Sequence, residues 1–333
     1  MARSVAVHFH PSCFPRALEA ALEASLRARR IHPPFLYDTP RRALLWLRVH
    51  EAFSPACTDP SCAEIYEAAS EAAARAVAGA GEVVVIALGC GSGQKEVRLL
   101  RRVLACGREA VRFVPVDISP GLALMAHDAA VTAGLSESAC TPVVMDLAAV
   151  EDWAAALASW LRPEARRVVT FFGMLPNVTP GTGLGRLAAL VRPGDALLVS
   201  ANLAPGPDYE AGVERMAPLY DNAPTRQWVS AGLLDLGVAQ GDGELEFRIA
   251  ECPEGSGLRR YEFGFVFRRR RVLEVAGRVH RFEAGERIAL FFSYRHTPER
   301  VGTVLQPHGL LVEQSWANAS GDEGVFLSPG VSQ

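Results

Sequence analysis

The sequence predicts an α/β fold: a doubly wound parallel sheet, with a smaller α+β segment inserted late in the chain. Two observations predict it. Between residues 83 and 202, short apolar runs rich in β-branched residues alternate with helical patterns, which is typical of parallel strands joined by helices. After residue 204 the pattern changes to strands with charged outer faces, and the strand–helix alternation returns only near the C-terminus.

The composition is that of a globular protein with a sizeable core. The chain has 333 residues, of which 49% are hydrophobic and 21% charged, so we expect a large domain and a smaller or interrupted one. A net charge of -3 provides no general field that attracts nucleic acid or anionic lipid. No apolar run approaches the roughly 20 residues of a membrane span. We therefore expect a cytoplasmic protein whose partner is a small molecule, without nucleic acid or membrane; the oligomeric state stays open.

The cysteines give no sign of a metal site. The chain has seven, and they form neither a CxxC pair nor a Cys/His ligand spacing. Cys57 and Cys62 leave a metal or a disulfide as the alternative. An odd total favours reduced, structural thiols, so we predict no bound metal.

Residues 1–79 are predicted to be helical. Leucines four positions apart within 16–30 indicate an amphipathic helix. Thr39 and Pro40 supply an N-cap and a first-turn proline for a second helix. An alanine-rich helix follows at 64–78. No part of this region alternates with period two, so we expect no strand in it.

The sheet that binds the ligand is expected within residues 80–204. Its strands are predicted at 83–88, 111–116, 142–145, 166–172 and 196–202. Its helices are predicted at 94–104, 120–133, 151–160 and 182–190.

Residues 205–293 are predicted to be an insertion, which packs with the N-terminal helices as a cap over the sheet. We expect a helix at 209–219 and strands at 245–250, 258–267, 271–279 and 287–293. Residues 294–333 then complete the sheet, with a helix at 298–305 and strands at 310–316 and 324–327.

The sharpest local motif is the glycine loop after the first strand of the sheet. It reads Leu-Gly-Cys-Gly-Ser-Gly over 88–93. Alternating glycines let the chain turn tightly and bring backbone N–H groups against a ligand. The third glycine of a dinucleotide fingerprint is absent, since Gln94 occupies its place, and this disfavours NAD.

Acidic residues follow the next two strands. Asp117 ends the second strand, where a carboxylate accepts hydrogen bonds from ribose hydroxyls in nucleotide-binding sheets. Asp146 follows the third strand, where it is placed to meet an adenine amino group. Either residue has a plainer alternative role, as the cap of the helix that follows it.

The fourth strand ends in Phe171-Phe172-Gly173 and continues to Asn177. Ligands bind beyond the carboxyl ends of such strands. Gly173 permits close approach, and Asn177 offers both a donor and an acceptor. Adjacent strand residues face opposite ways, so we expect one phenyl ring in the core and the other, Phe172, near the ligand.

Five runs together resemble a known family. They are ALGCGSGQKEVRLL, FVPVDIS, FFGMLPN, PLYDN and GERIALFFSYRH, within residues 83–316. They resemble the S-adenosylmethionine (SAM)-dependent histidine Nα-methyltransferases of ergothioneine biosynthesis and their relatives. The resemblance implies a class I methyltransferase (Rossmann-like) fold with a substrate domain that recruits the N-terminus. It also implies SAM as the cosubstrate.

The resemblance assigns roles by position. It implies that Gly89, Gly91 and Lys95 belong to the cofactor loop, with Asp117 on the ribose, Asp146 near adenine and Gly173 by the acceptor amino acid. Together with the residue patterns above, we predict a cofactor site of Gly89, Gly91, Gly93, Lys95, Asp117, Asp146, Phe172 and Gly173. It implies that Asn177 and Tyr220 act on the amino-acid head group, in a substrate pocket that also holds Asp221, Phe291 and Ser293.

The sequence departs from this family at the acceptor pocket. Phe291 stands where the family has a glutamate that binds the imidazole of histidine, and a phenyl ring accepts no such hydrogen bond. The family's tyrosine-rich segment is not recognisable around residues 56–64. The sequence therefore favours N-methylation of a small, apolar or aromatic α-amino acid over histidine. The alternatives are cyclisation of SAM to azetidine-2-carboxylate and a binding protein without catalytic activity.

Overall fold

The computed structural model describes residues 4–106, 110–179, 181 and 183–330, and its largest feature is one mixed sheet. The strand order is β1-β4-β3-β2-β5-β6-β13-β12. Strands β1 to β6 run parallel, and β13 and β12 join the edge in antiparallel fashion. The strands are β1 (His8–Phe9), β2 (Glu82–Leu88), β3 (Ala110–Asp117), β4 (Val143–Val144), β5 (Arg166–Phe171), β6 (Ala196–Asn202), β12 (Gln314–Ala317) and β13 (Glu323–Pro329).

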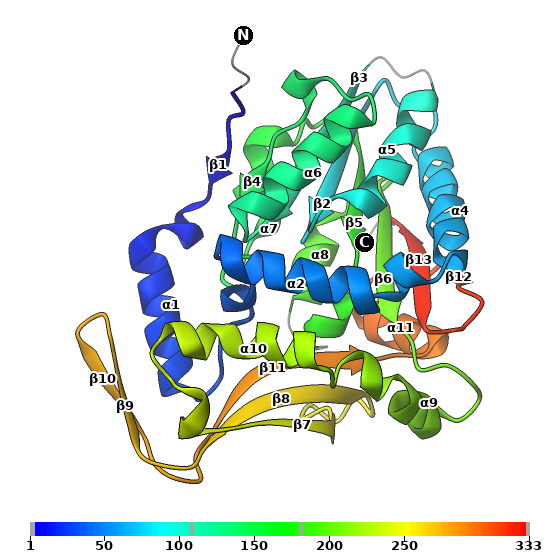
Figure 1. Ribbon diagram of the computed structural model, residues 1–333. Helices are drawn as coiled ribbons and strands as arrows, with labels where there is room; N and C mark the ends of the chain where they lie inside the picture. The colour runs from blue at the N-terminus through cyan, green and yellow to red at the C-terminus, as the bar shows by residue number, and fades with distance from the viewer. Residues whose placement is uncertain (1–3, 107–109, 180, 182, 331–333) are drawn as a thin grey trace.

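Helices cover both faces of this sheet, because its central strands are apolar on both sides (Figure 1). Buried residues of α4 (Ser61–Ala76), α5 (Gln94–Ala105) and α6 (Pro120–Thr132) pack on one face. Those of α7 (Trp153–Leu157), α8 (Leu184–Leu190) and α11 (Pro298–Leu305) pack on the other. The predicted α/β doubly wound fold is confirmed. The predicted start of α8, Thr182, lies outside the described residues.

A second, antiparallel sheet has the order β11-β8-β7. Its strands are β7 (Gly243–Glu251), β8 (Arg259–Phe267) and β11 (Arg287–Arg295), and α9 (Tyr209–Met216) precedes them. An apolar core joins this sheet to α1 (Pro15–Arg27), α2 (Pro40–Phe53) and α10 (Ala223–Asp235). In Figure 1, α10 lies over the second sheet and α2 lies between α10 and the large sheet. The N-terminal helices thus stand beside the carboxyl ends of the parallel strands.

The predicted strand at 271–279 is wrong. The chain forms instead a hairpin of β9 (Arg271–Val275) and β10 (Arg278–Phe282). Ala276 and Gly277 have φ angles of +50° and +73°, the conformation of a tight two-residue hairpin turn. The apolar residues on either side concealed this turn in the sequence.

Two further expectations need correction, and one helix was not predicted. The N-terminal region is not wholly helical, since β1 pairs with β4 at the sheet edge through backbone hydrogen bonds that need no alternating pattern. Strand β12 begins at Gln314 rather than at Leu310, because Leu310 packs into the core beneath the sheet. Helix α10 was not predicted; its signal was an Asn222 side chain that caps the Thr225 N–H at 2.9 Å.

Among the residues that the structure describes, no helix combines the length and the apolar character that a membrane crossing requires. The division of the chain at residues 79, 204 and 293 stays a prediction.

Candidate functional site

The glycine loop connects β2 to α5 through a backbone that only glycine adopts readily. Gly89, Gly91 and Gly93 have φ angles of +67°, +52° and +74°. A Cβ on Gly93 would lie 2.7 Å from the Cα of Ala126 on α6, and a Cβ on Gly91 would lie 3.0 Å from Cη2 of Trp46 on α2. The loop is therefore a bare backbone surface, packed between α2 and α6.

Asp117 connects the carboxyl end of β3 to this loop. Its Oδ2 accepts a hydrogen bond from the Gly91 N–H at 3.0 Å, and its Oδ1 accepts one from the Ser119 N–H at 2.9 Å. Burial raises the pKa of the carboxyl to about 6, against the lowering effect of these N–H donors. Each oxygen keeps a second lone pair for a ligand hydroxyl. The arrangement fits the ribose of SAM.

Asp146 is already engaged by protein groups. Its Oδ1 accepts from the N–H groups of Ala148 and Ala149 at 2.9 and 3.0 Å, as a cap does. Its Oδ2 lies 2.6 Å from Nε2 of His32. The capping alternative is therefore present in the structure. Contact with adenine stays a prediction, and it requires the second lone pair of Oδ2 or a movement of His32.

The two phenylalanines at the end of β5 face opposite sides of the sheet, as expected. The Phe171 ring lies 6.2 Å from the Trp153 ring, in the core under α7. The Phe172 ring lies 5.1 Å from the Tyr66 ring, edge to face, on the side of α4. Phe172 is almost fully buried, so its contact with SAM stays a prediction.

Gly173 and Asn177 lie just beyond β5. The Gly173 N–H donates to Oγ of Ser200 on the neighbouring strand at 2.8 Å, and its φ is +69°. Asn177 ends a short 3₁₀ turn (Leu175–Asn177) that packs against β11, the strand that carries Phe291. Asn177 is half-buried and makes no side-chain hydrogen bond to another described residue, which leaves its amide for a ligand.

Tyr220 and Ser293, predicted from distant parts of the chain, lie together. The Tyr220 hydroxyl accepts a hydrogen bond from Nδ2 of Asn202 at 2.7 Å and lies 3.2 Å from Oγ of Ser293. Asn202, at the carboxyl end of β6, was not predicted; its position at a strand end was the only signal. Because Asn202 occupies one lone pair of the phenol oxygen, the Tyr220 hydroxyl has a defined direction.

Phe291 lies within an aromatic group. Its ring is 5.2 Å from the Trp228 ring, edge to face, and 6.4 Å from the Tyr220 ring, nearly parallel to it. Phe263 packs on its third side, at 6.4 Å. Phe291 is half-buried, so part of the ring remains accessible beside the Tyr220 hydroxyl network.

Two residues change the predicted pocket. The Asp221 carboxylate forms an ion pair with Nε of Arg226 at 2.7 Å, where both groups are partly exposed; its place in the pocket stays a prediction. Tyr37 was not predicted. Its ring contacts Trp46 and Trp228, and the pKa of its phenol is raised by burial and then by the nearby charges of Asp117 and Tyr220. Tyr37 therefore lies near both Asp117 and Tyr220.

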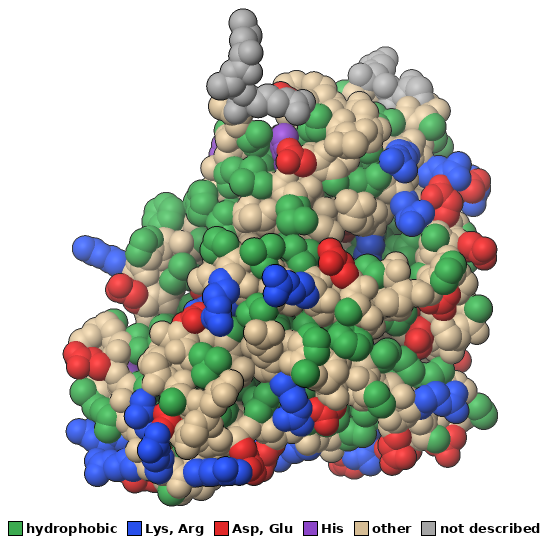
Figure 2. Space-filling model, in the orientation of Figure 1, with side chains coloured by type: hydrophobic (Ala, Val, Ile, Leu, Met, Phe, Trp, Pro, Cys, Tyr) green, Lys and Arg blue, Asp and Glu red, His purple; other side chains and the backbone are tan. Residues whose placement is uncertain are grey.

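Lys95, at the start of α5, lies where the loop meets β5. Its Nζ is 4.0 Å from the position that a Cβ would take on Gly173. The same Nζ is 3.8 Å from Oε1 of Glu323 and 5.1 Å from the centre of the Tyr66 ring. Figure 2 shows a hollow between the segments labelled α2, α4 and α5 in Figure 1, with a basic side chain at its bottom.

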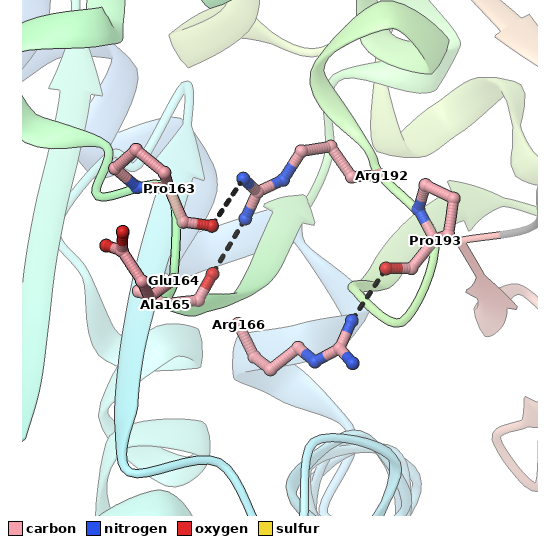
Figure 3. Close-up of a pocket in the computed structure, with 6 residues that line it drawn as sticks. All are labelled: Pro163, Glu164, Ala165, Arg166, Arg192 and Pro193. Atoms are coloured by element: carbon pink, nitrogen blue, oxygen red, sulfur yellow. Dashed lines mark hydrogen bonds between the residues drawn. The ribbon is translucent and has the colours of Figure 1, made fainter.

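A separate cavity of about 390 Å³ lies at the opposite ends of the parallel strands, next to the residues that precede β5 and β6 (Figure 3). Its two guanidinium groups already donate to backbone carbonyls: Arg166 to Pro193 at 2.7 Å, and Arg192 to Pro163 and Ala165 at 3.0 and 2.7 Å. Ligands of doubly wound sheets bind at the carboxyl ends of the strands, so this cavity is not the candidate site.

In the part of the chain that the structure describes, no group of three or more histidine, cysteine, aspartate or glutamate side chains has the arrangement of a metal site. All seven cysteines are free thiols.

One family of known proteins matches the chain. The pattern of the family described as "Histidine-specific methyltransferase, SAM-dependent" matches residues 18–215, more than half of the chain. No curated protein matches the chain.

Several solved structures are similar to this chain at low sequence identity. The magnesium protoporphyrin IX methyltransferase ChlM of Synechocystis PCC 6803, solved with bound SAH, is 11% identical, with a TM-score of 0.45 over 89% of this chain and 97% of that one. The CcbJ methyltransferase of Streptomyces caelestis is 14% identical, with a TM-score of 0.39 over 80% and 96%. The amino pentose methyltransferase CalS10 of Micromonospora echinaspora, solved with SAM, is 13% identical, with a TM-score of 0.38 over 85% and 97%.

The family match spans the glycine loop, Asp117 and the end of β5, and its members are SAM-dependent transferases. SAM is therefore the cosubstrate. The chain belongs to the family of histidine-specific, SAM-dependent methyltransferases.

Proposed function

We propose that this enzyme transfers the methyl group of SAM to the α-amine of a small amino acid whose side chain is apolar or aromatic, rather than to histidine. The observation that carries the proposal is the aromatic group around Phe291. Where the family resemblance places a carboxylate for imidazole, this chain has a phenyl ring packed on Trp228 and Phe263. Such a surface favours an apolar side chain.

The residues around the ring supply the head-group contacts. Asn177 offers an amide that makes no hydrogen bond to another described residue, and the Tyr220 hydroxyl, ordered by Asn202, lies next to Ser293. These groups would hold the amino and carboxylate ends of the acceptor, while Lys95 would hold the carboxylate of SAM. Alignment of the amine nitrogen, the methyl carbon and the sulfur is then the protein's main contribution to rate.

The reaction requires a neutral amine. Its lone pair forms the N–C bond, the electron pair of the S–CH3 bond returns to sulfur, and the ammonium product releases a proton. Low solvent access and the positive sulfonium both lower the pKa of an α-ammonium in this place, which favours the neutral amine. The products are S-adenosylhomocysteine (SAH) and an N-methyl amino acid.

A second candidate function follows from the same ring. With no carboxylate to bind a separate acceptor, the α-amine of SAM itself becomes the available nucleophile. Attack on its own γ-carbon breaks the Cγ–S bond, whose electron pair stays on sulfur, and a proton is released. The products would be azetidine-2-carboxylate and methylthioadenosine. The aromatic faces near Phe291 suit the sulfonium cation that this reaction consumes.

One experiment separates the two reactions. The enzyme is incubated with SAM alone and with a panel of amino acids, and the adenosyl product is identified by mass spectrometry. SAH that forms only with an apolar or aromatic amino acid supports methyl transfer; methylthioadenosine without acceptor, above a protein-free control, supports cyclisation. Preferred methylation of histidine would contradict both.

A further inference from the structure

Glu323 is a buried carboxylate that the proposed reaction does not use. It begins β13 and is 1% exposed. Its Oε1 accepts a hydrogen bond from the Tyr66 hydroxyl at 2.6 Å, and its Oε2 is buried without a hydrogen-bond partner among the described residues. A buried carboxylate with an unsatisfied oxygen destabilises the folded protein unless nearby cations compensate it.

Two cations lie near Glu323, one on each side of the candidate site. Lys95 Nζ is 3.8 Å from Oε1 and borders Gly173 on the cofactor side. Burial raises the pKa of the Glu323 carboxyl, and the positive charges of Lys95 and of the buried Arg295 oppose that rise. The Arg295 guanidinium lies 4.8 Å above the Tyr220 ring on the acceptor side. Tyr66, which donates to Glu323, packs edge to face on Phe172.

The net charge around Lys95 and Arg295 affects how well SAM binds. SAM carries one positive charge more than SAH, at the sulfonium. Two lysine or arginine cations without an anion would repel it, since charges in a poorly solvated site interact over several ångströms. SAH, with a neutral sulfur, would not be affected in this way.

We propose that Glu323 is a positioning residue that fixes Lys95 beside Gly173 and balances the charges of Lys95 and Arg295, so that the site prefers cationic SAM to neutral SAH. This inference rests on the proposed location of the methionine part of SAM between the glycine loop and Gly173. It does not depend on the identity of the acceptor, because it concerns binding before any methyl transfer.

The test is calorimetric binding of SAM and SAH, without acceptor, to Glu323→Gln and to the wild-type enzyme. We expect the Kd for SAM to rise at least tenfold and the Kd for SAH to change less than threefold, so that the SAM:SAH preference falls. Lys95→Met removes a cation and should move the same preference in the opposite direction. Tyr66→Phe keeps the charge and should leave the preference unchanged.

Glu262→Gln is the matched control. Glu262 is also a buried carboxylate, but it forms ion pairs with Arg248 and Arg260 on the second sheet, so its variant should leave the SAM:SAH preference unchanged. If Glu323→Gln weakens the binding of SAM and of SAH equally, Glu323 has only a structural role. If Glu323→Gln does not fold, the Lys95→Met result decides, and an unchanged preference there overturns the proposal. An incorrect acceptor assignment would leave all of these affinities as expected.

Discussion

Asp117 shows how one buried side chain can serve both the fold and a ligand. Its two oxygens hold the Gly91 and Ser119 N–H groups, so the glycine loop and the end of β3 keep a fixed relation before any ligand arrives. A carboxylate held in this way needs little rearrangement to accept a ribose hydroxyl.

Asp117→Ala should weaken the binding of SAM and of SAH alike, by about 1–3 kcal/mol, because both contain the ribose that the carboxylate would hold. Titration calorimetry measures both affinities. Asp152→Ala is a suitable control, because Asp152 caps α7 through the Ala155 N–H and is exposed. Unchanged affinities in Asp117→Ala would remove Asp117 from the site.

Phe291 determines, in our proposal, which side chain the pocket accepts. A histidine donor left unpaired against the ring costs about 1–3 kcal/mol, so histidine should be used at least tenfold less well than the true substrate. Phe291→Glu should lower the native activity at least tenfold and raise the relative use of histidine, whereas Phe291→Leu should retain most of the native activity. Initial rates with each acceptor measure this. Full native activity in Phe291→Glu would show that the ring does not line the pocket.

At the level of elements, the glycine loop depends on how closely α5 approaches α6. Gly93→Ala forces a positive φ on alanine and places Cβ 2.7 Å from backbone of α6, whereas Gly79→Ala forces a similar φ of +82° with nothing within 4 Å. We expect Gly79→Ala to cost about 1 kcal/mol of unfolding free energy and Gly93→Ala about 2–4 kcal/mol, because only the second adds steric overlap. Urea denaturation measures both. Equal losses would show that α5 shifts without cost.

The sequence predicted elements well where a local pattern carries them. Helix α11 and strand β6 have the expected bounds, and Thr39 caps α2 through the Arg42 N–H as its position before Pro40 indicated. The prediction from sequence failed where tertiary contacts determine whether a strand or a turn forms. The β9–β10 turn lies inside residues 271–279, which were predicted as one strand, and β1 exists only because β4 offers it an edge.

The residues of the candidate site also fall into two groups, those that a local pattern predicts and those that only tertiary contacts bring together. Asp117 follows from a strand end and a glycine motif that lie near each other in the chain. Tyr37, Asn202 and Glu323 do not, because each meets its partners only when segments far apart in sequence come together. Tyr66 and Glu323, for example, are bonded across 257 positions. No periodicity or spacing predicts such a pair.

At the scale of the whole molecule, buried acids and buried histidines oppose each other in their effect on stability. Glu96 bonds to the Thr170 hydroxyl, and burial raises the pKa of its carboxyl from 4.5 to about 7. His296 is also buried, and desolvation, helped by the charges of Arg295 and Arg300, lowers the pKa of its imidazole from 6.5 to about 3.

The signs follow from proton binding. Between pH 4.5 and 7 folded Glu96 holds a proton that the unfolded chain releases, so its contribution to the unfolding free energy falls as pH rises. Between pH 3 and 6.5 the unfolded chain binds a proton at residue 296 that the folded chain does not, so this contribution rises with pH. The two effects cancel where these ranges overlap.

Single substitutions should therefore tilt the pH dependence of stability in opposite directions. Between pH 5 and 6, we compare the slope of the unfolding free energy against pH with that of the wild-type protein. The slope should be about 1 kcal/mol per pH unit more positive in Glu96→Gln and about 1 kcal/mol per pH unit more negative in His296→Leu, because each substitution removes the proton binding of one group. Urea unfolding at half-unit pH steps measures the slopes. The slope, unlike the absolute stability, does not depend on packing losses that each substitution causes at every pH. Parallel curves for the three proteins would mean that neither group changes its pKa on folding.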